Sequence, residues 1–590
     1  MEIKSEISKL TSNFLFKNYD IKVEKIEIQN TKKDFDGDIT IVLFPFFKLI
    51  NKDQISQIGK ILGDSLIKNS IYLIDFNIVG GFLNLSVSDA YYLDFIETIK
   101  DDLNFGKVES TNDTYIVEFS SPNTNKPLHL GHIRNNLLGY SISKILEANG
   151  KKVQKVQIIN DRGIHICKSM VAWKQFSEGA TPDSEKTKGD KFVGDYYIMF
   201  DKVHKDQMSQ LIDSGMDKDV ASENTEIMKA AKKELMNWEK NNKETRQVWK
   251  MMNDWVYDGF DKTYSLLGVS FDKNYYESET YLLGKNIMEE GLKKGVLYER
   301  EDSSVWINLD KEGLDEKLLL RSDGTSVYMT QDLGTAVQRI ADNSNVKGMI
   351  YTVGNEQDYH FKVLFKILNK LGYDWADNLF HLSYGMVDLP SGKMKSREGT
   401  VVDADDLIYD LIDTVKHTTE SLDKYKSNNE TLDFDEYKKI ALGALKYYIL
   451  KVDPKKNILF NPEESIDLSG NTGPFIQYAY VRIQSILKKV NKHIQIDKSY
   501  QLNEKEKEVI KTIYEYPSVI IGSYNELSPA LIANYLYDLV RNYNSLYQNH
   551  HILNSETKES TSVRLIISQK TSHIIESACD LLGIDLPDRM

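Results

Sequence analysis

The chain has 590 residues, of which 41% are hydrophobic and 27% are charged, and its formal net charge at pH 7 is −14. These values are typical of a large soluble protein with several domains. The negative charge excludes a protein that coats nucleic acid indiscriminately, and the absence of a run of about 18 apolar residues excludes a membrane span. Two distant cysteines and a start without a signal-peptide core predict a cytoplasmic protein with no structural disulfides and no zinc.

The first part of the chain, residues 1–110, predicts a separate small α/β domain. Apolar residues alternate from Ile39 to Leu43 and again from Val79 to Val87, and each run indicates a strand. A helix is expected between them, near residues 52–68. This domain would be followed by a nucleotide-binding half-fold that begins at about residue 111.

A strand–loop–helix–strand unit opens that half-fold. Residues 114–119 predict a strand, and the apolar spacing from Ile133 to Leu146 predicts a helix. Residues 153–159 predict a second, buried strand. The loop between the first strand and the helix, from Ser120 to His132, carries the most informative residues of the chain.

Two histidines, His129 and His132, stand at the end of this loop, three residues apart. Pro122 and Pro127 exclude a continuous helix or central strand upstream of them, so the histidines would lie where a loop enters a helix. The N–H groups and dipole of a helix N-terminus favour anions. Two imidazoles there predict a site that stabilises charge developing on a phosphate.

A long insertion and a second β–α–β unit come next. Residues from about 171 to 300 are too many for a loop, and their pattern predicts a mostly helical insertion. Residues 348–354 then predict a strand, 361–368 a helix and 379–387 another strand. The chain therefore predicts two halves of one parallel sheet, separated by the insertion.

A basic loop follows the last of these strands. Between Gly392 and Thr400, three cations occur within five residues, at Lys393, Lys395 and Arg397. Glycine near each end gives such a loop freedom to move, and clustered cations suit a triphosphate. We expect this loop to act together with the histidine loop on one nucleotide.

From about residue 405 the pattern is almost wholly helical. Residues 471–590 contain 13 basic and 13 acidic residues, so the negative excess lies upstream. This neutral region holds 10 of the 34 tyrosines, on whose rings unpaired RNA bases can stack, although most of them are expected in the helix core.

These motifs resemble those of a known family. The histidine loop resembles the ATP-binding signature of class I aminoacyl-tRNA synthetases, and the basic loop resembles their Lys-Met-Ser-Lys-Ser loop. Ser396 replaces the second lysine of that loop, whereas Lys126 precedes the first histidine, as in many arginyl-tRNA synthetases. Residues 470–480 and 586–590 are similar to that family's anticodon-domain opening and chain end. The chain thus resembles arginyl-tRNA synthetases over nearly its whole length.

The resemblance implies a fold and a reaction. It implies a class I Rossmann-type catalytic domain over 111–405 with the insertion at about 171–300, a small α/β N-terminal domain over 1–110 that contacts tRNA, a helical connector over 406–465 and an all-α anticodon-binding bundle over 466–590. The implied reaction joins L-arginine to tRNA(Arg) through arginyl-adenylate and releases AMP and pyrophosphate. It uses ATP with Mg²⁺, no prosthetic group and no zinc, and the implied protein is a monomer.

The resemblance also assigns residues. The catalytic set is Lys126, His129, His132, Lys393 and Lys395. The ATP-binding set adds Pro122, Asn123, Gly131, Gly354, His360, Met394, Ser396 and Arg397. The arginine-binding set is Glu118, Ser121, Asn123, Glu277, Tyr328, Asp332 and Gln357, in which Glu277 and Asp332 face the guanidinium because a cation taken from water needs carboxylate partners. The tRNA-binding candidates are Phe82, Asn84 and Tyr478.

Three alternatives remain open at this point. Another class I synthetase would share the histidine motif, but the cysteine enzyme brings zinc ligands and the glutamine enzyme has no use for two acids. A small nucleotidylyltransferase also uses paired histidines, but its chain is far shorter. A non-catalytic tRNA-binding relative would be favoured by loss of the histidines or the basic loop, and both motifs are present.

Overall fold

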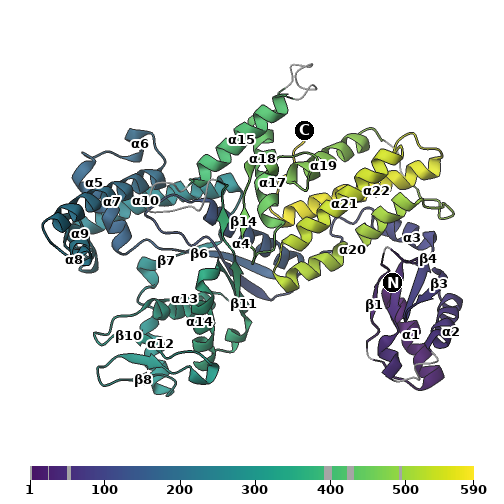
Figure 1. Cartoon of the computed structure of the whole chain (residues 1–590), viewed down its shortest axis with the longest axis horizontal. Helices are drawn as coiled ribbons and strands as arrows, with labels where there is room; N and C mark the ends of the chain where they lie inside the picture. Colours follow the sequence, from purple (N-terminus) through teal and green to yellow (C-terminus); the bar gives the residue numbers. More distant parts are fainter. Residues whose placement is uncertain are drawn as a thin grey trace. The chain divides into compact units, whose positions relative to one another are not determined.

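The computed structural model describes residues 3–23, 25–32, 34–48, 55–343, 345–390, 402–421, 431–490 and 495–590. Its contacts divide the chain into two compact units. One unit comprises residues 1–105, 483–515 and 539–573, and the other comprises 106–482, 516–538 and 574–590. Figure 1 shows the elements of both units, and each unit is described here by itself.

The first unit contains a four-stranded antiparallel sheet near the N-terminus. The strand order is β1 (Ile28–Asn30), β2 (Ile39–Val42), β4 (Phe82–Val87) and β3 (Leu73–Val79). Helices α1 (Ile3–Tyr19), α2 (Ile55–Asn69) and α3 (Asp89–Ile99) accompany the sheet, with a 3₁₀ turn at Phe44–Lys48 (Figure 1). The expected α/β fold of this region is therefore present.

One predicted strand in this sheet is wrong. The run from Val79 to Val87 is not a single strand, because β3 ends at Val79 and β4 begins at Phe82. Gly80 and Gly81 between them both have positive φ, at 56° and 90°. Two such residues form the tight turn of a hairpin, which glycine adopts without steric cost.

The second unit is built on a five-stranded parallel sheet. The order is β12 (Leu379–Tyr384), β11 (Val346–Gly354), β5 (Thr114–Glu118), β6 (Lys152–Ile159) and β7 (Lys273–Tyr276). Helix α4 (Leu130–Ala148) connects β5 to β6, and α14 (Asp358–Lys370) connects β11 to β12. The strand order reverses between β5 and β11, where sheets of this kind bind ligands at their carboxyl ends. The predicted Rossmann-type fold is confirmed.

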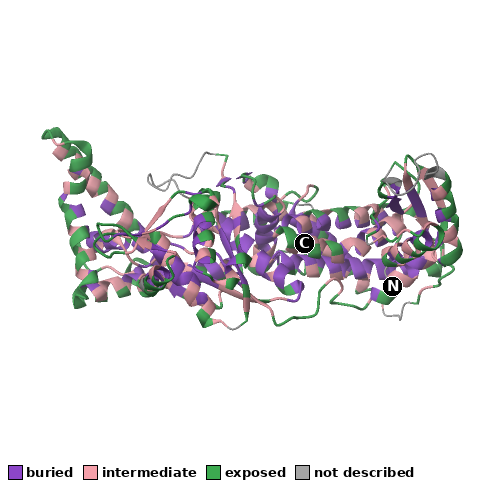
Figure 2. Ribbon diagram, turned by 90° about the horizontal axis from the view of Figure 1, so that it is seen from below, coloured by how far each residue is buried: buried purple, intermediate pink, exposed green. Residues whose placement is uncertain are grey.

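The helical part of the insertion lies between β6 and β7. It comprises α5 (Ile164–Phe176), α6 (Pro182–Glu185), α7 (Gly189–Asp213), α8 (Lys218–Asn224), α9 (Glu226–Glu239) and α10 (Lys243–Leu267). In the second half of α7, residues 201–213 are all partly or fully exposed, so Figure 2 draws them in pink and green. These exposed residues leave a large polar helix surface.

The chain returns to the parallel sheet at β7, within the range expected for the insertion. This strand lies at the edge of the sheet and reads Lys-Asn-Tyr-Tyr, so it lacks the apolar run of a central strand. A small antiparallel sheet follows, with the order β10 (Lys317–Leu320), β9 (Val305–Ile307) and β8 (Tyr298–Glu299), together with α11 (Glu277–Thr280) and α12 (Gly284–Lys293). Helix α13 (Tyr328–Asp342) leads to β11.

A second predicted strand, residues 379–387, is also interrupted. Strand β12 ends at Tyr384, and after Gly385 and Met386 the chain forms β13 (Val387–Asp388). Strand β13 leaves the main sheet and pairs in parallel with β14 (Ile458–Leu459). The change of direction takes the chain toward the segment that precedes the C-terminal helices.

The described residues after 402 are almost entirely helical, as expected. The helices are α15 (Ala404–Ser421), α17 (Phe434–Leu450), α18 (Pro462–Ser465), α19 (Gly473–Leu487), α20 (Glu504–Glu526), α21 (Ala530–Asn549) and α22 (Lys558–Leu581). Tyr516, Tyr535 and Tyr543 are buried among them, whereas Tyr478 is exposed. Three of the ten tyrosines in residues 471–590 are buried, five are partly exposed and two are exposed, so the expectation that most of them lie in the helix core is wrong. Among the described residues, no helix combines the length and apolar character needed to cross a membrane.

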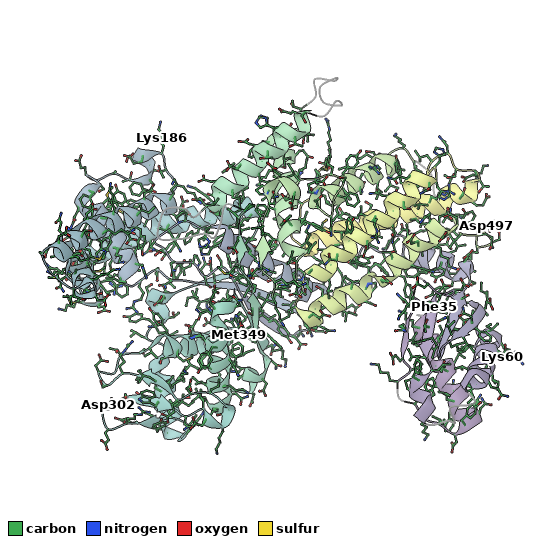
Figure 3. All side chains as sticks on the ribbon, in the orientation of Figure 1. Phe35, Lys60, Lys186, Asp302, Met349 and Asp497 are labelled. Atoms are coloured by element: carbon green, nitrogen blue, oxygen red, sulfur yellow. The ribbon has the colours of Figure 1, made fainter. Side chains whose placement is uncertain are left out.

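An apolar core surrounds the parallel sheet. Met349 on β11, labelled in Figure 3, is buried in it, together with Ile116 of β5 and Val156 of β6. Strand β5 has an apolar centre from Tyr115 to Val117, whereas β6 alternates apolar residues with Gln154, Lys155 and Gln157. This rigid centre places the polar loops that leave the carboxyl ends of its strands.

Candidate active site

The histidine loop leaves β5 through two strained residues. Ser120 and Ser121 have φ values of 68° and 48°, in the left-handed region that costs non-glycine residues about 1–3 kcal/mol each. The turn is held by specific bonds: the Ser120 N–H donates to Oδ1 of Asn135, and the Ser121 hydroxyl donates to Oε1 of Glu118 at 2.9 Å. These two left-handed residues turn the chain sharply where it leaves the sheet.

The two histidines begin α4 and bond to its backbone. Nδ1 of His129 accepts the N–H of Gly131 at 3.2 Å, and Nδ1 of His132 accepts the N–H of His129 at 3.2 Å. Each neutral ring must therefore carry its hydrogen on Nε2. A Cβ at position 131 would lie 3.0 Å from the His129 ring, so glycine permits this close approach. The result is that both Nε2–H groups are left as donors at one helix start.

The electrostatics keep both rings neutral. Burial and the neighbouring Lys126 lower the pKa of His129 to about 4, and burial together with His129 and Lys126 holds the pKa of His132 well below its usual range. Burial also lowers the pKa of the Lys126 ammonium, and no acid in the described residues offsets that effect. A partly buried cation without a carboxylate is electrostatically suited to an anionic ligand.

A cavity of about 450 Å³ adjoins the histidine loop. Its wall includes Asn125, Lys126 and His129 from the loop, Lys191 and Tyr197 from α7, and Asp403. The volume is in the range of small-molecule sites. The cavity therefore brings the insertion helices and the predicted nucleotide site together.

Glu277, predicted to bind a guanidinium, is a perturbed acid. It begins α11, and burial raises its pKa to about 7, with further contributions from the nearby charges of Asp161 and Asp332; Arg162 opposes the shift. The charged form of Glu277 therefore lacks a sufficient counter-charge in this structure. A cationic ligand would supply that counter-charge.

Asp332, the other predicted guanidinium partner, lies on α13 and already has a neighbour. Its Oδ2 is 2.6 Å from Nε2 of His360, which lies in the first turn of α14. His360 was expected to bind ATP, but its ring contacts a residue of the predicted arginine set. Tyr328, at the start of α13, is 76% exposed and free to meet a ligand.

Two further predicted residues, Glu118 and Ser121, belong to a buried polar cluster. The Glu118 carboxylate forms an ion pair with Arg339, and both side chains are buried. Arg339 was not predicted, although its spacing from Leu333 and Ala336 on the buried face of α13 is a signal for it. Glu118 is thus neutralised by the protein itself and shapes the turn after β5.

Asp161 is a second residue that the sequence did not reveal. It is buried just beyond β6, and its carboxylate accepts the N–H and hydroxyl of Ser278 at 2.8 and 2.6 Å and the hydroxyl of Tyr257 at 3.0 Å. These bonds hold the start of α11, and with it Glu277, against the end of the sheet. No recognisable motif surrounds Asp161.

The other predicted small-molecule contacts lie at the same strand ends. Pro122 is buried and its carbonyl accepts the N–H of Asn160, while Asn123 is exposed beside it. Gly354 ends β11 and Gln357 lies in the 3₁₀ turn Asn355–Gln357 that follows. The structure thus gathers the described members of the ATP and arginine sets at the carboxyl edge of one sheet.

The basic-loop residues Lys393, Met394, Lys395, Ser396 and Arg397 lie outside the described residues. The chain beyond the loop is described: Asp403 forms an isolated bridge with His129, and the Ala404 N–H donates to the Leu128 carbonyl at 2.9 Å. Burial raises the pKa of Asp403 to about 6. The chain that follows the basic loop is therefore bonded to the histidine loop.

The predicted tRNA contacts have different outcomes. Asn84 is only 2% exposed, its Oδ1 accepts the Thr40 hydroxyl at 2.7 Å and its Nδ2 donates to Asn77 at 2.8 Å. A side chain so buried and bonded cannot contact tRNA, so that prediction is wrong. Phe82 is partly exposed and packs edge-on against Phe44, and Tyr478 is exposed on α19 beside Arg482.

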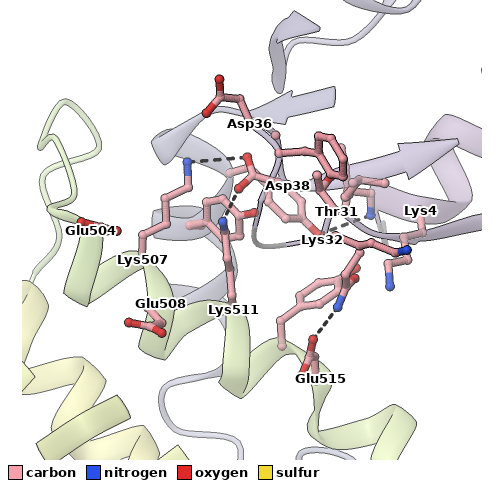
Figure 4. A pocket seen from close by; sticks show the side chains of 18 of the residues that line it. Lys4, Thr31, Lys32, Asp36, Asp38, Glu504, Lys507, Glu508, Lys511 and Glu515 are labelled. Atoms are coloured by element: carbon pink, nitrogen blue, oxygen red, sulfur yellow. Dashed lines mark hydrogen bonds and ion pairs between the residues drawn. The ribbon is translucent and has the colours of Figure 1, made fainter. Parts of the chain in front are cut away.

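A larger cavity, of about 710 Å³, lies in the first unit (Figure 4). At its centre Asp38 is paired with Lys507, at 3.6 Å, and with Lys511. Acidic and basic residues line it in equal number, and its paired carboxylate is already satisfied. Among the described residues no group of three or more histidines, cysteines or acids is placed to hold a metal ion.

Two family models match the chain. The model described as "tRNA synthetases class I (R), catalytic domain" matches residues 96–461, and the "DALR anticodon binding domain" matches residues 476–590. Together they cover the parallel sheet, its insertion and the C-terminal helices. The first of them alone covers more than half of the chain.

Whole-chain relatives agree with these matches. Proteins named "Arginine--tRNA ligase" from Flavobacterium psychrophilum and Parabacteroides distasonis are 54% and 48% identical to the chain. The first alignment covers 97% of both chains, and the second covers 97% of this chain and 96% of that protein. Among solved structures, an arginyl-tRNA synthetase from Thermus thermophilus matches with a TM-score of 0.80 at 22% identity, covering 99% of this chain and all of that one. An arginyl-tRNA synthetase from Plasmodium falciparum matches with a TM-score of 0.77 at 19% identity, covering 100% of this chain and 99% of that one. The structural likeness shows a shared fold across the full length.

Proposed function

The chain belongs to the arginyl-tRNA synthetase family of class I aminoacyl-tRNA synthetases, and we propose how its residues perform that family's reaction. The enzyme ligates arginine to tRNA(Arg). In the first step the carboxylate of arginine attacks the α-phosphorus of ATP, which gives arginyl-adenylate and pyrophosphate. In the second, the 2′-hydroxyl of the terminal ribose of tRNA attacks the activated carbonyl and releases AMP.

The observation that carries the proposal is the pair of neutral imidazoles at the start of α4. Since both Nδ1 atoms accept backbone N–H groups, both Nε2–H groups are available to donate to phosphate oxygens. Neutral donors bind the phosphates without adding a full charge, and their bonds strengthen as charge develops in the transition state. His129 and His132 therefore stabilise the transition state by position and dipole, not by proton transfer.

Lys126 supplies a full positive charge in the same place. It precedes His129 by three residues, and its charge lowers the pKa of both imidazoles, so the three groups share one field. We assign Lys126 to the phosphates, where it replaces the lysine that Ser396 displaces. Lys393 and Lys395 would act with it, and Mg²⁺ enters as part of the ATP complex. No covalent nucleophile from the protein is required.

The arginine substrate is held by acids at the neighbouring strand ends. The charge of Asp332 contributes to the raised pKa of Glu277, which shows that the two carboxylates repel each other. A guanidinium bound between them would relieve that repulsion. Tyr328 would cover the planar group, and Asn123 and Gln357 would bind the amino-acid end. Ser121 and Glu118 support that end through the turn after β5, since Glu118 is already paired with Arg339.

The proposal assigns tRNA to the two remaining regions. The helical domain, residues 466–590, would bind the anticodon with Tyr478 as a stacking surface, and the N-terminal domain, residues 1–110, would contact the outer corner of the tRNA through Phe82. The catalytic domain over 111–405 and the connector over 406–465 complete the expected division. We propose a monomer that acts in the cytoplasm.

Charging of unfractionated tRNA with each of the twenty amino acids tests the function. Label from arginine alone, dependent on ATP and Mg²⁺, is the expected result. Pyrophosphate exchange with and without tRNA then reports on the first step separately. Charging with another amino acid, or none with any amino acid despite bound ATP, would overturn the proposal.

A further inference from the structure

A buried arginine stands two residues after His132, on the same helix. Arg134 is 0% exposed, and its guanidinium forms no ion pair with any acid of the described residues. Burial lowers its pKa to about 10, well within the charged range at neutral pH. A buried charge of this kind needs other partners, and the partners define its role.

The partners are four backbone carbonyls. Nη1 of Arg134 donates to Gly385 at 2.6 Å and to Met386 at 3.1 Å. Nη2 donates to Pro454 at 2.9 Å and to Lys456 at 2.7 Å. Hydrogen bonds from a charged donor are stronger than neutral ones, so these four offset part of the cost of burying the guanidinium.

The four carbonyls belong to two segments that also bond to each other. One is the stretch Gly385 to Asp388, and the other is the stretch 454–460. The Gly385 N–H donates to Pro454, the Ile458 N–H to Met386 and the Phe460 N–H to Asp388, at 2.8–2.9 Å. Strands β13 and β14 are the paired centre of this arrangement.

The junction has little room for change. A Cβ at Gly385 would lie 2.5 Å from Oδ1 of Asn457 and 2.8 Å from the backbone of Lys456. That same Oδ1 accepts the Met386 N–H at 2.9 Å. The position of the stretch 385–388 relative to α4 is therefore set by two features. One is the close backbone approach at Gly385, and the other is the set of four carbonyls that the two terminal nitrogens of Arg134 bond.

This position matters because the stretch 385–388 leads directly into the basic loop. Strand β13 ends at Asp388, and Lys393, the first cation of the predicted basic loop, comes five positions later. Helix α4 carries both His129 and Arg134, so one rigid element bonds to the phosphate-binding loop and to the chain that enters the basic loop.

We propose that Arg134 is a positioning residue for the ATP step: it holds the entry to the basic loop at a set place relative to the two histidines. The inference rests on the proposed function of both motifs. Lysine at this position keeps the charge but lacks the planar fork, so it cannot reach four carbonyls. ATP binding should suffer, whereas the arginine site, built on α11 and α13, should not.

The test uses the full-length enzyme in arginine-dependent pyrophosphate exchange with tRNA present. For Arg134→Lys we expect the KM for ATP to rise about tenfold or more, because small displacements of binding groups are costly, and the KM for arginine to change less than about twofold. A matched control is Arg564→Lys, which alters another buried arginine, paired with Glu506, in the first unit; it should leave both KM values unchanged.

A merely structural role gives a different outcome. Partial unfolding would lower kcat and leave the KM values for ATP and arginine unchanged. That result would overturn the proposal, and so would equal rises in both KM values. If Arg134→Lys does not fold, Gly385→Ala and Asn457→Ala disturb the same junction from the other side and must raise the KM for ATP selectively. Failure of the wild type to exchange with arginine would instead contradict the proposed function.

Discussion

The carboxylate of Asp332 lies 2.6 Å from Nε2 of His360, so an acid assigned to the substrate has a protein donor before the substrate arrives. The imidazole occupies Oδ2 and leaves Oδ1 for another donor. Asp332 also contributes to the raised pKa of Glu277, so the charges of the two carboxylates oppose each other. The His360 contact orients Asp332 without satisfying it.

Asp332→Asn should weaken arginine binding by about 2 kcal/mol, the lower end of the range for truncating one side of a charge pair, since the free carboxylate is partly exposed. The amide keeps the shape of the side chain and loses its charge. Calorimetric titration with arginine measures the effect, and His360→Gln serves as a control that keeps the charge of Asp332. An unchanged arginine affinity in D332N would remove Asp332 from the site.

Arginine affinity should depend on pH through Glu277. Its pKa is raised to about 7, above the usual 4.5, so below pH 7 the folded enzyme holds a neutral acid. Binding a guanidinium requires the carboxylate and therefore releases a proton. The dissociation constant should fall up to tenfold per pH unit as the pH rises toward 7, and it should level off above 7.

The same shift has a defined effect on stability. A group whose folded pKa is raised stabilises the fold below its unfolded pKa, here about 4.5, and that contribution is lost as the pH rises through about 7. Arginine titrations in two buffers of different ionisation enthalpy report directly the proton that Glu277 releases on binding. In Glu277→Gln the pH dependence of arginine affinity between pH 5 and 7 should disappear. A pH dependence that persists would assign the effect to another group.

His129→Asn separates capping from catalysis. Asparagine is a good N-cap, so the variant should fold at pH 7, but it lacks the Nε2–H donor. We expect adenylate formation to slow by about 10²–10³-fold, as when one transition-state donor is removed. Single-turnover adenylate formation measures this rate, and a fall of less than threefold would contradict the assigned role.

The same variant should also be less sensitive to acid. Because the folded pKa of His129 is about 4 and the ordinary value is 6.5, the wild-type fold loses stability as the pH falls from 6.5 toward 4, where the unfolded chain binds a proton that the folded chain does not. Urea unfolding at several pH values should show a shallower decline for His129→Asn than for the wild type. Equal declines would mean that His129 is not the group responsible.

Lys126→Ala should lower adenylate formation far more than arginine binding. The ammonium is partly buried with no offsetting acid in the described residues, so its charge is available to the phosphates. Its loss should also raise the pKa of His129 and His132, whose values Lys126 depresses. Pyrophosphate exchange and arginine titration on the same preparation make the comparison. Equal losses in both would show a general structural effect.

Much of the catalytic fold follows from local patterns. The strand 114–119, the helix after His132 and the helix 361–368 were all predictable because periodicity and proline placement act over a few residues. Where two glycines closed a hairpin at 80–81, or where the strand 379–387 left the sheet, the apolar run continued across the break and concealed it. The polar edge strand β7 was missed for the opposite reason, since it has no apolar run.

The sequence by itself determined the histidine loop as the candidate phosphate site, the parallel sheet and, through resemblance, the family and its substrate. Only the tertiary structure decided which partners each polar group has. Asn84 proved to be buried, Glu118 to be paired with Arg339, and both imidazoles to present Nε2. Arg134 meets carbonyls more than 250 positions away. Such contacts depend on how whole elements pack, and the chain carries no short-range pattern that encodes them.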